Sequence, residues 1–198
     1  MKKLPLFLAI LSLGLVLSTG RSFAQGATTV APEAGSFGSY IDGNVGALFC
    51  ASGAACTGRD ARFQIQFEPG SRFFAFPLSI SFGQKIFMAG IKPRFQYFIA
   101  PISALEKLWI GPGVGLVVNY QKLSATGSTG HVIELGMQFN LALQYKITKS
   151  LHVSFTPMAL DYDFWRKYFV DAGPLSATGT DSKKGIVYGI LGGVGFSY

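Results

Sequence analysis

Strict alternation of apolar and polar side chains is the feature that most restricts how this 198-residue chain can fold. It is clearest in His131–Tyr145, HVIELGMQFNLALQY, where large apolar residues fill most odd positions and polar residues such as Glu134 and Asn140 fill even ones. A helix would spread the two sets around its circumference, whereas a strand places them on opposite faces. The segment therefore predicts a β-strand with one apolar and one polar face.

The same period of two recurs along the chain and predicts eight strands. They are residues 37–49, 61–68, 72–83, 87–99, 108–121, 131–145, 151–162 and 185–198. The connections at 69–71, 100–107 and 146–150 are short to moderate, and those at 50–60, 122–130 and 163–184 are longer and rich in Gly, Ser and Thr. Only the link near Gln84 and Lys85 breaks this alternation. Short turns at one end and longer loops at the other are typical of an outer-membrane barrel.

The composition restricts the setting of such a sheet. The chain is 49% hydrophobic and only 14% charged, whereas soluble domains carry roughly 25% charged residues. Beyond the N-terminus no apolar run reaches the roughly 18 residues that a membrane helix needs. These two facts leave an all-core soluble protein or a membrane β-barrel.

The N-terminus has the pattern of a secretory signal peptide. Lys2 and Lys3 precede the apolar stretch Leu4–Leu17, and small residues at Ser22 and Ala24 suit a signal peptidase. We expect residues 1–24 to be cleaved, 25–36 to be a flexible leader and 37–198 to form the barrel. The segment holds three of the 17 Lys and Arg residues and none of the 10 acidic ones, which leaves a net charge of +4. This small, scattered charge argues against a nucleic-acid partner.

The polar face of the predicted strands is not built like a water-exposed surface. It combines glycine, glutamine and asparagine with a few charges, a composition that suits a narrow interior where bulk is limited and charges pair. We therefore predict a lumen charge network of Asp42, Arg62, Lys92, Arg94 and Glu134. Because an eight-stranded barrel is filled by its own side chains, no wide pore is expected.

Aromatic residues gather where the predicted strands meet the short turns. They are Phe67, Tyr97, Trp109, Tyr145, Phe196 and Tyr198, and they are expected to form an interfacial girdle. At the opposite end, Arg166 and Lys167 of DYDFWRKYF either reach anionic headgroups or belong to an ordinary loop base.

The predicted signal peptide, the eight alternating strands and the terminal ILGGVGFSY together resemble the small outer-membrane proteins of the OmpX and opacity-protein type. Val194, Phe196 and Tyr198 look like the assembly signal of that family, although the small Gly192 departs from it at one position. The resemblance implies a closed, eight-stranded, antiparallel up-and-down transmembrane β-barrel, monomeric and located in the bacterial outer membrane. Its implied partners are membrane lipid, lipopolysaccharide and the barrel assembly machinery.

The two cysteines, Cys50 and Cys56, lie six residues apart in CASGAACTG. In an exported chain such neighbours are expected to form a disulfide that closes a surface loop. No histidine lies near them, so a metal site is a poor alternative, and no cofactor is expected.

His152 and Ser154 form the one candidate catalytic pair, since the spacing places both on the inward face of a predicted strand. Some eight-stranded barrels that deacylate lipid A use such a His-x-Ser pair. Phe155 replaces the asparagine of that pattern, and His152 lies near the periplasmic turn, far from lipid A. We therefore expect no enzyme but a structural or surface-interaction role. A small gated channel is the main alternative, followed by a lipid A-modifying enzyme and a soluble barrel that binds an apolar ligand.

Overall fold

The computed structural model describes residues 38–52, 61–83, 86–99, 107–125, 128–172, 175–181 and 185–198. Almost all of them lie in strands. The strands are β1 (Tyr40–Ser52), β2 (Arg62–Gly70), β3 (Phe74–Ala75), β4 (Leu78–Phe82), β5 (Ile86–Ile91), β6 (Arg94–Gln96), β7 (Leu108–Ala125), β8 (Ser128–Lys146), β9 (Leu151–Ala172), β10 (Leu175–Asp181) and β11 (Gly185–Ser197). Within the described residues, no helix is long and apolar enough to cross a lipid bilayer.

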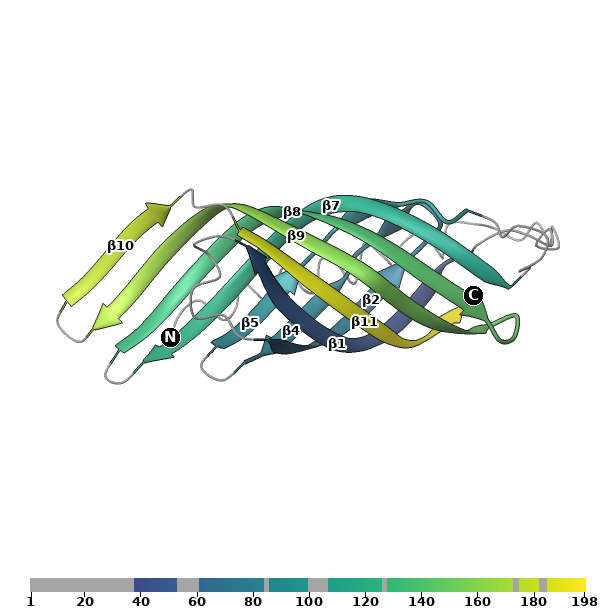
Figure 1. The fold of residues 1–198 in the computed structure, drawn as a ribbon, viewed down its shortest axis with the longest axis horizontal. Coiled ribbons are helices and arrows are strands. Elements are labelled where there is room, and N and C mark those ends of the chain that lie inside the picture. Colours follow the sequence, from purple (N-terminus) through teal and green to yellow (C-terminus); the bar gives the residue numbers. More distant parts are fainter. Residues whose placement is uncertain are drawn as a thin grey trace, which may run out of the picture. The chain divides into compact units, whose positions relative to one another are not determined.

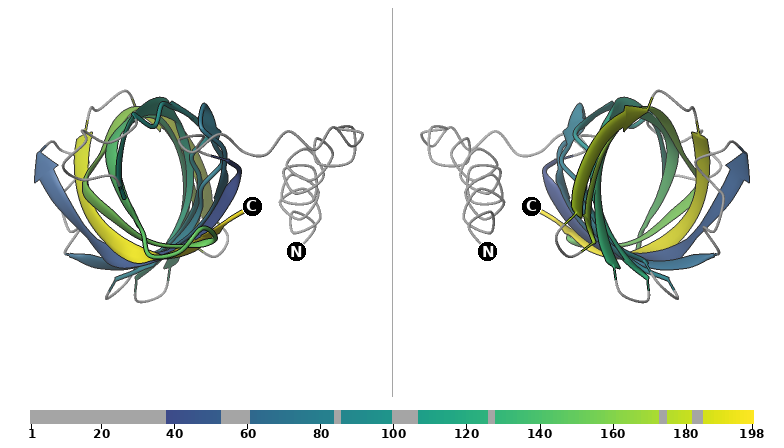
Figure 2. Two further views of the ribbon diagram at one scale, coloured as in Figure 1. Left: turned by 90° about the vertical axis from the view of Figure 1, so that its right-hand side faces the viewer. Right: turned by 90° about the vertical axis from the view of Figure 1, so that its left-hand side faces the viewer.

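Eight strands form a closed ring of antiparallel ladders. The hydrogen bonds run β1–β11–β9–β8–β7–β5–β4–β2, and β2 pairs back with β1. The short strands β3 and β6 continue β4 and β5 beyond interruptions at Pro77 and Pro93, since proline cannot donate to a ladder. Seen end on, the strands form a ring (Figure 2). The predicted closed, eight-stranded, antiparallel barrel is confirmed.

Burial alternates along the strands, with polar side chains buried and apolar side chains exposed. In β2 the polar residues Arg62, Gln64, Gln66 and Glu68 are at most 3% exposed. The intervening Phe63, Ile65 and Phe67 are 43–52% exposed. A water-soluble barrel buries its apolar face, so this sheet is built with its apolar face outward and its polar face inward.

We call the end where β11 terminates the turn end, and the end that carries β10 the loop end. Near the turn end, Tyr40, Phe98, Trp109 and Ala142 pack inside the barrel, with the Tyr40 and Phe98 rings edge to face at 5.8 Å. The prediction that Trp109 faces outward is therefore wrong, because it shares the inward parity of β7 with Val117. The other predicted girdle residues are exposed: Phe67, Tyr97, Tyr145, Phe196 and Tyr198.

At the loop end the sheet extends further than the sequence predicts. β9 runs on to Ala172, and β10 pairs with its last residues, from Asp181 opposite Arg166 to Leu175 opposite Ala172. Much of the predicted loop 163–184 is therefore a hairpin, and β7 and β8 likewise reach into the predicted loop 122–130. Backbone pairing needs no apolar side chains, so the Ser, Thr and Gly composition does not prevent it. Figure 1 shows β7, β8 and β9 as long strands, with β10 beside the far end of β9.

Candidate functional site: the polar lumen

The interior of the barrel holds the charged residues that the alternation places there. Asp42, Arg62, Lys92, Arg94 and Glu134 are each at most 3% exposed. Charges removed from water need partners of opposite sign or several hydrogen bonds. The partners are buried residues that the prediction omitted: Glu68, His152, Asp161, Asp163 and Arg166.

Arg94 is the centre of a network that crosses the lumen near the turn end. Its Nη2 pairs with Glu68 Oε1 at 2.5 Å, and its Nε and Nη1 donate to Gln96 and Gln138 at 3.0 and 3.2 Å. The Tyr40 hydroxyl donates to the same Glu68 oxygen at 2.7 Å. These five side chains come from β1, β2, β6 and β8, so the network connects strands on different sides of the ring.

A second ion pair joins this network through Gln138. Lys92, between β5 and β6, lies 2.6 Å from Asp161 Oδ2 on β9. Gln138 Nε2 donates to the other oxygen of Asp161 at 2.9 Å while its own carbonyl accepts from Arg94. Gln138 therefore connects the two ion pairs across the interior.

Toward the loop end, Arg166 of β9 forms a third charged group with two acids. Its Nε lies 2.9 Å from Glu134 Oε1, and its Nη2 lies 3.5 Å from Asp163. Gln121 donates to Glu134 from β7. Of the two alternatives left open for Arg166, contact with lipid headgroups is excluded, because the residue is 3% exposed and ion-paired inside the barrel.

Two bulges in β9 explain why the sequence pattern did not place Asp161 inside, whereas Asp163 and Arg166 lie beyond the predicted end of the strand at residue 162. The inward positions are even at His152 and Ser154, odd at Asp161 and Asp163, and even again at Arg166. The β8–β9 register shifts between Leu141 and Leu143 and again between Leu135 and Gly136. Each extra residue in β9 exchanges the two faces of the strand.

Arg62 occupies a less polar part of the lumen. Leu48, Met88 and Val187 form a buried apolar cluster there, from β1, β5 and β11. Arg62 Nη1 lies 3.4 Å from Met88 Sδ. This cluster and the aromatic cluster at the turn end both consist of buried side chains inside the barrel.

A further polar cluster lies on the seam where β1 and β11 close the ring. His152 Nε2 is 2.5 Å from Asp42 Oδ1, and its Nδ1 is 3.1 Å from Ser197 Oγ. Gln144 Nε2 donates to Asp42 Oδ2 at 2.9 Å. At Gly195 a Cβ atom would collide with Asp42 and His152. The cluster thus links β1, β8, β9 and β11 and requires a glycine at its centre.

The candidate catalytic pair has separate partners in the structure. Ser154 Oγ donates to Asn44 Oδ1 at 2.6 Å, whereas the two ring nitrogens of His152 face Asp42 and Ser197. The order Asp42, His152, Ser197 has the connectivity of a charge-relay triad. Asp42 and His152 are at most 2% exposed, whereas Ser197 at the end of this chain of bonds is partly buried.

The remaining predicted residues lie at the two ends of the barrel. Val194, Phe196 and Tyr198 are 56%, 60% and 68% exposed, on the outward face of the closing strand. Cys50 lies near the loop end, partly buried against the Leu48 cluster. Cys56 lies outside the described residues, as do the signal peptide and leader, so the disulfide and the cleavage remain predictions. In the described part of the chain no three His, Cys, Asp or Glu residues are grouped as a metal ion would need.

Comparison with known proteins gives likeness of structure alone. No protein-family model and no curated protein matches the sequence. Neisserial surface protein A is 13% identical with a TM-score of 0.53, over 81% of this chain and 97% of that one. A major outer membrane protein from Thermus thermophilus is 11% identical with a TM-score of 0.50, over 81% and 99%.

The fold is that of the small outer-membrane β-barrels. The predicted resemblance to the OmpX and opacity-protein type is thereby confirmed as a likeness of architecture. At 11–13% identity these likenesses show a shared fold and do not extend to individual side chains. Any role of the chain must therefore be argued from its own side chains.

Proposed function

We propose that the chain is a non-enzymatic integral protein of the bacterial outer membrane, with a structural or surface-interaction role and no wide pore. In this proposal residues 1–24 direct export, and the mature barrel is a monomer. Its partners are outer-membrane lipid, lipopolysaccharide and the barrel assembly machinery that inserts it.

One observation carries the membrane placement, namely the inversion of the barrel. Among the described strands, each of the eight in the ring pairs with a neighbour on both sides, which is the condition that the bilayer core imposes on a sheet. Its outer wall exposes large apolar side chains such as Phe63, Leu116 and Phe139, at 44–58%. Its interior holds ion pairs instead. This distribution would be unfavourable in water and is favourable in lipid.

The packed lumen supports the absence of a wide pore. Arg94, Glu68, Lys92 and Asp161 form ion pairs in the interior, and two clusters of buried apolar side chains lie inside it as well. Planar-bilayer recordings of the purified barrel are expected to show no porin-like conductance. Stable open events of nanosiemens size would contradict this part of the proposal and favour the channel.

The membrane placement is tested by fractionation together with a heat-shift gel. A closed barrel keeps its ladders in SDS at room temperature and unfolds on boiling, so the two samples are expected to migrate differently. The protein is expected in the outer-membrane fraction. Migration unchanged by boiling, or recovery from the soluble periplasm, would contradict the proposal.

The orientation is tested with a membrane-impermeant maleimide on whole cells, in a background whose native cysteines are replaced by serine. Gly179→Cys in β10 offers an exposed site at the loop end, where an added Cβ meets nothing within 4 Å. Ser150→Cys in the exposed β8–β9 turn is the matched control at the turn end. We expect labelling of Gly179→Cys in intact cells, and of Ser150→Cys only after the outer membrane is permeabilised. The reverse pattern would invert the proposed orientation.

A further inference from the structure

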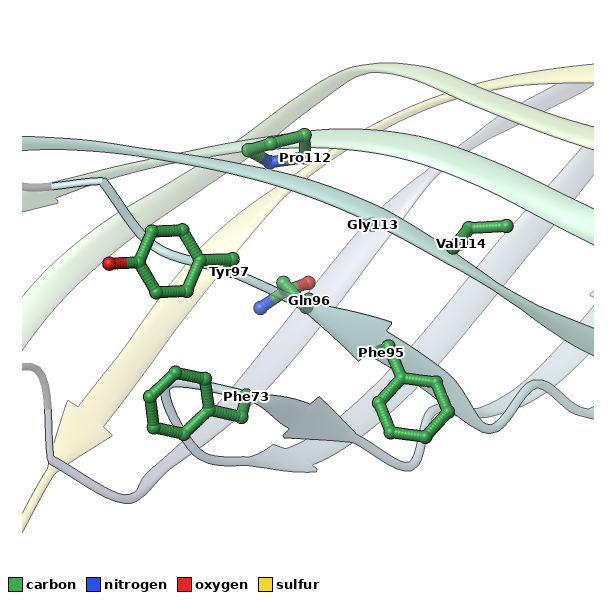
Figure 3. Close-up of a pocket in the computed structure, with 7 residues that line it drawn as sticks. All are labelled: Phe73, Phe95, Gln96, Tyr97, Pro112, Gly113 and Val114. Atoms are coloured by element: carbon green, nitrogen blue, oxygen red, sulfur yellow. The ribbon is translucent and has the colours of Figure 1, made fainter.

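An apolar groove of about 440 Å³ lies on the outer wall, where β3, β6 and β7 meet. It is lined by Phe73, Phe95, Gln96, Tyr97, Pro112, Gly113 and Val114. Phe73, Phe95, Tyr97 and Val114 are 40–71% exposed, so their side chains stand out from the wall. Figure 3 shows the Tyr97 and Phe73 rings toward one end of the groove, and Phe95 and Val114 toward the other.

The groove results from an irregularity in the sheet. β6 is only three residues long, and its ladder with β7 ends where Gln96 faces Gly113. Beyond it the pairing continues through single bonds, Tyr97 N to Pro112 O at 3.1 Å and Ile99 N to Ile110 O at 2.9 Å. The Gln96 side chain points inward, toward Tyr40 and Arg94. It therefore does not fill the groove between the outward-facing rings.

Arg72 stands at the end of this groove, in the turn between β2 and β3. Its guanidinium carbon lies 5.5 Å from the Phe73 ring centroid and 5.1 Å from that of Tyr97. Its Nη2 donates to the Tyr97 hydroxyl at 3.0 Å. Two rings and one hydrogen bond therefore hold the cation in one place beside the apolar surface.

Charge at the turn end favours an anion. Among the described residues there, the charged side chains that reach solvent are Arg72, Lys107, Lys146 and Lys149. The acids among the described residues at this end, Asp42 and Glu68, are 2% and 3% exposed and are paired inside the lumen. The Arg72 Nε atom is buried and has no hydrogen-bond partner among the described residues.

From this geometry we infer that the groove and Arg72 form a binding site for an anionic glycerophospholipid of the periplasmic leaflet. The guanidinium contacts the phosphate, and one acyl chain runs along the wall between Phe73, Tyr97 and Phe95. The inference rests on the proposed membrane orientation, which places the turn end at the periplasmic leaflet. The acyl chain then lies parallel to its neighbours in the bilayer.

The two parts of the site contribute differently. An acyl chain leaves surroundings as apolar as the groove it enters, so its transfer supplies little hydrophobic driving force. Its contribution is packing against ordered rings. The charge-assisted contact of a fixed guanidinium with phosphate is the stronger term, since arginine matches a phosphate with two parallel donors. Removal of Arg72 should therefore weaken binding more than a change in the groove does.

The test is native mass spectrometry of the folded barrel released from detergent with added dioleoyl phosphatidylglycerol. The variants are Arg72→Gln and Lys149→Gln, which each remove one positive charge from the turn end. Val114→Trp fills the groove, and Leu116→Trp is its control two residues along the outward face of β7. A heat-shift gel of each sample reports separately whether the barrel has folded.

We expect one phosphatidylglycerol to remain bound to the native protein and to Lys149→Gln. Arg72→Gln should weaken its retention at least tenfold, and Val114→Trp should weaken it several-fold, with Leu116→Trp unchanged. Equal losses in Arg72→Gln and Lys149→Gln would overturn the site, because retention would then follow net charge alone. Stronger retention of lipid A than of phosphatidylglycerol would overturn the assigned leaflet. A barrel that folds and inserts but shows no Arg72-dependent retention would overturn the lipid site and leave the proposed function intact.

Discussion

Gly195→Ala is the sharpest test of the seam cluster, because it adds one methyl group at the point where β1, β9 and β11 meet. In the structure an added Cβ lies in collision with Asp42 Oδ1 and His152 Nε2, and 2.8 Å from His152 Cε1. Ordinary contact begins at 3.4 Å, so the imidazole must move by at least 0.6 Å. The imidazole is held at 2.5 Å by Asp42 and at 3.1 Å by Ser197, so such a movement strains both contacts.

The expected loss follows from two effects. Overpacking of a filled interior costs about 1–3 kcal/mol, and weakening a buried hydrogen bond to a carboxylate costs about 1.5–3 kcal/mol. We expect Gly195→Ala to lower the free energy of unfolding by about 2 kcal/mol or more. Gly192→Ala on the same strand is the matched control, since its Cβ meets only Phe155 Cδ2 and Ser154 O at 3.9 Å. Its effect should stay within about 0.5 kcal/mol.

The assay is a reversible urea titration of the refolded barrel in detergent micelles, followed by tryptophan fluorescence and the heat-shifted fraction on gels. His152→Ala serves as a second background, because removal of the ring gives the methyl group room. There Gly195→Ala should cost less than it does in the native protein, as expected for residues in contact. Equal losses for Gly195→Ala and Gly192→Ala, or full additivity with His152→Ala, would refute the reasoning.

Three further predictions concern the lumen and the closing strand. Lys92→Met leaves the charge of the Asp161 carboxylate without its partner and should cost about 3–5 kcal/mol in the same titration. Addition of Asp161→Leu should recover most of this loss of stability. Failure to recover it would show that the unpaired carboxylate is not the cause of the loss. A fluorophosphonate probe should leave the folded protein unlabelled, and labelling abolished by Ser197→Ala would instead establish a hydrolase. Deletion of residues 196–198 removes ladder contacts with β1 and should reduce the heat-shifted fraction far more than deletion of residues 178–180 from the β10 hairpin; equal effects would contradict it.

Regular strands could be predicted from the sequence because alternation alone determines their faces. The polar even positions in the middle of β8, Glu134, Gln138, Asn140 and Gln144, are buried, and Phe139 and Tyr145 are exposed as the alternation predicts. The five predicted lumen charges lie inside for the same reason. The closure of the ring follows from the requirement that backbone groups in lipid be paired.

The contacts that the sequence could not indicate depend on the register between neighbouring strands. Two single-residue bulges reverse the faces of β9, so no fixed parity finds Asp161, Asp163 and Arg166 together. The partners of His152 come from Asp42, 110 residues away, and Ser197, 45 residues away, and only the pairing of first and last strands brings them together. Trp109 is a separate case. Trp109 and Val117 both occupy odd positions of the same predicted strand, and this shared parity could have placed Trp109 on the inward face.

The seam also has a consequence for the order in which the barrel forms. β1 and β11 are neighbours in space but the most distant strands along the chain, so their pairing has the largest loop-closure entropy of any ladder in the ring. The hairpins β7–β8 and β8–β9 join adjacent segments and can form before it. Asp42, His152 and Ser197 therefore come together only when the wall is complete. The NMR signal of the His152 imidazole then reports the last step of folding, separately from the growth of the sheet.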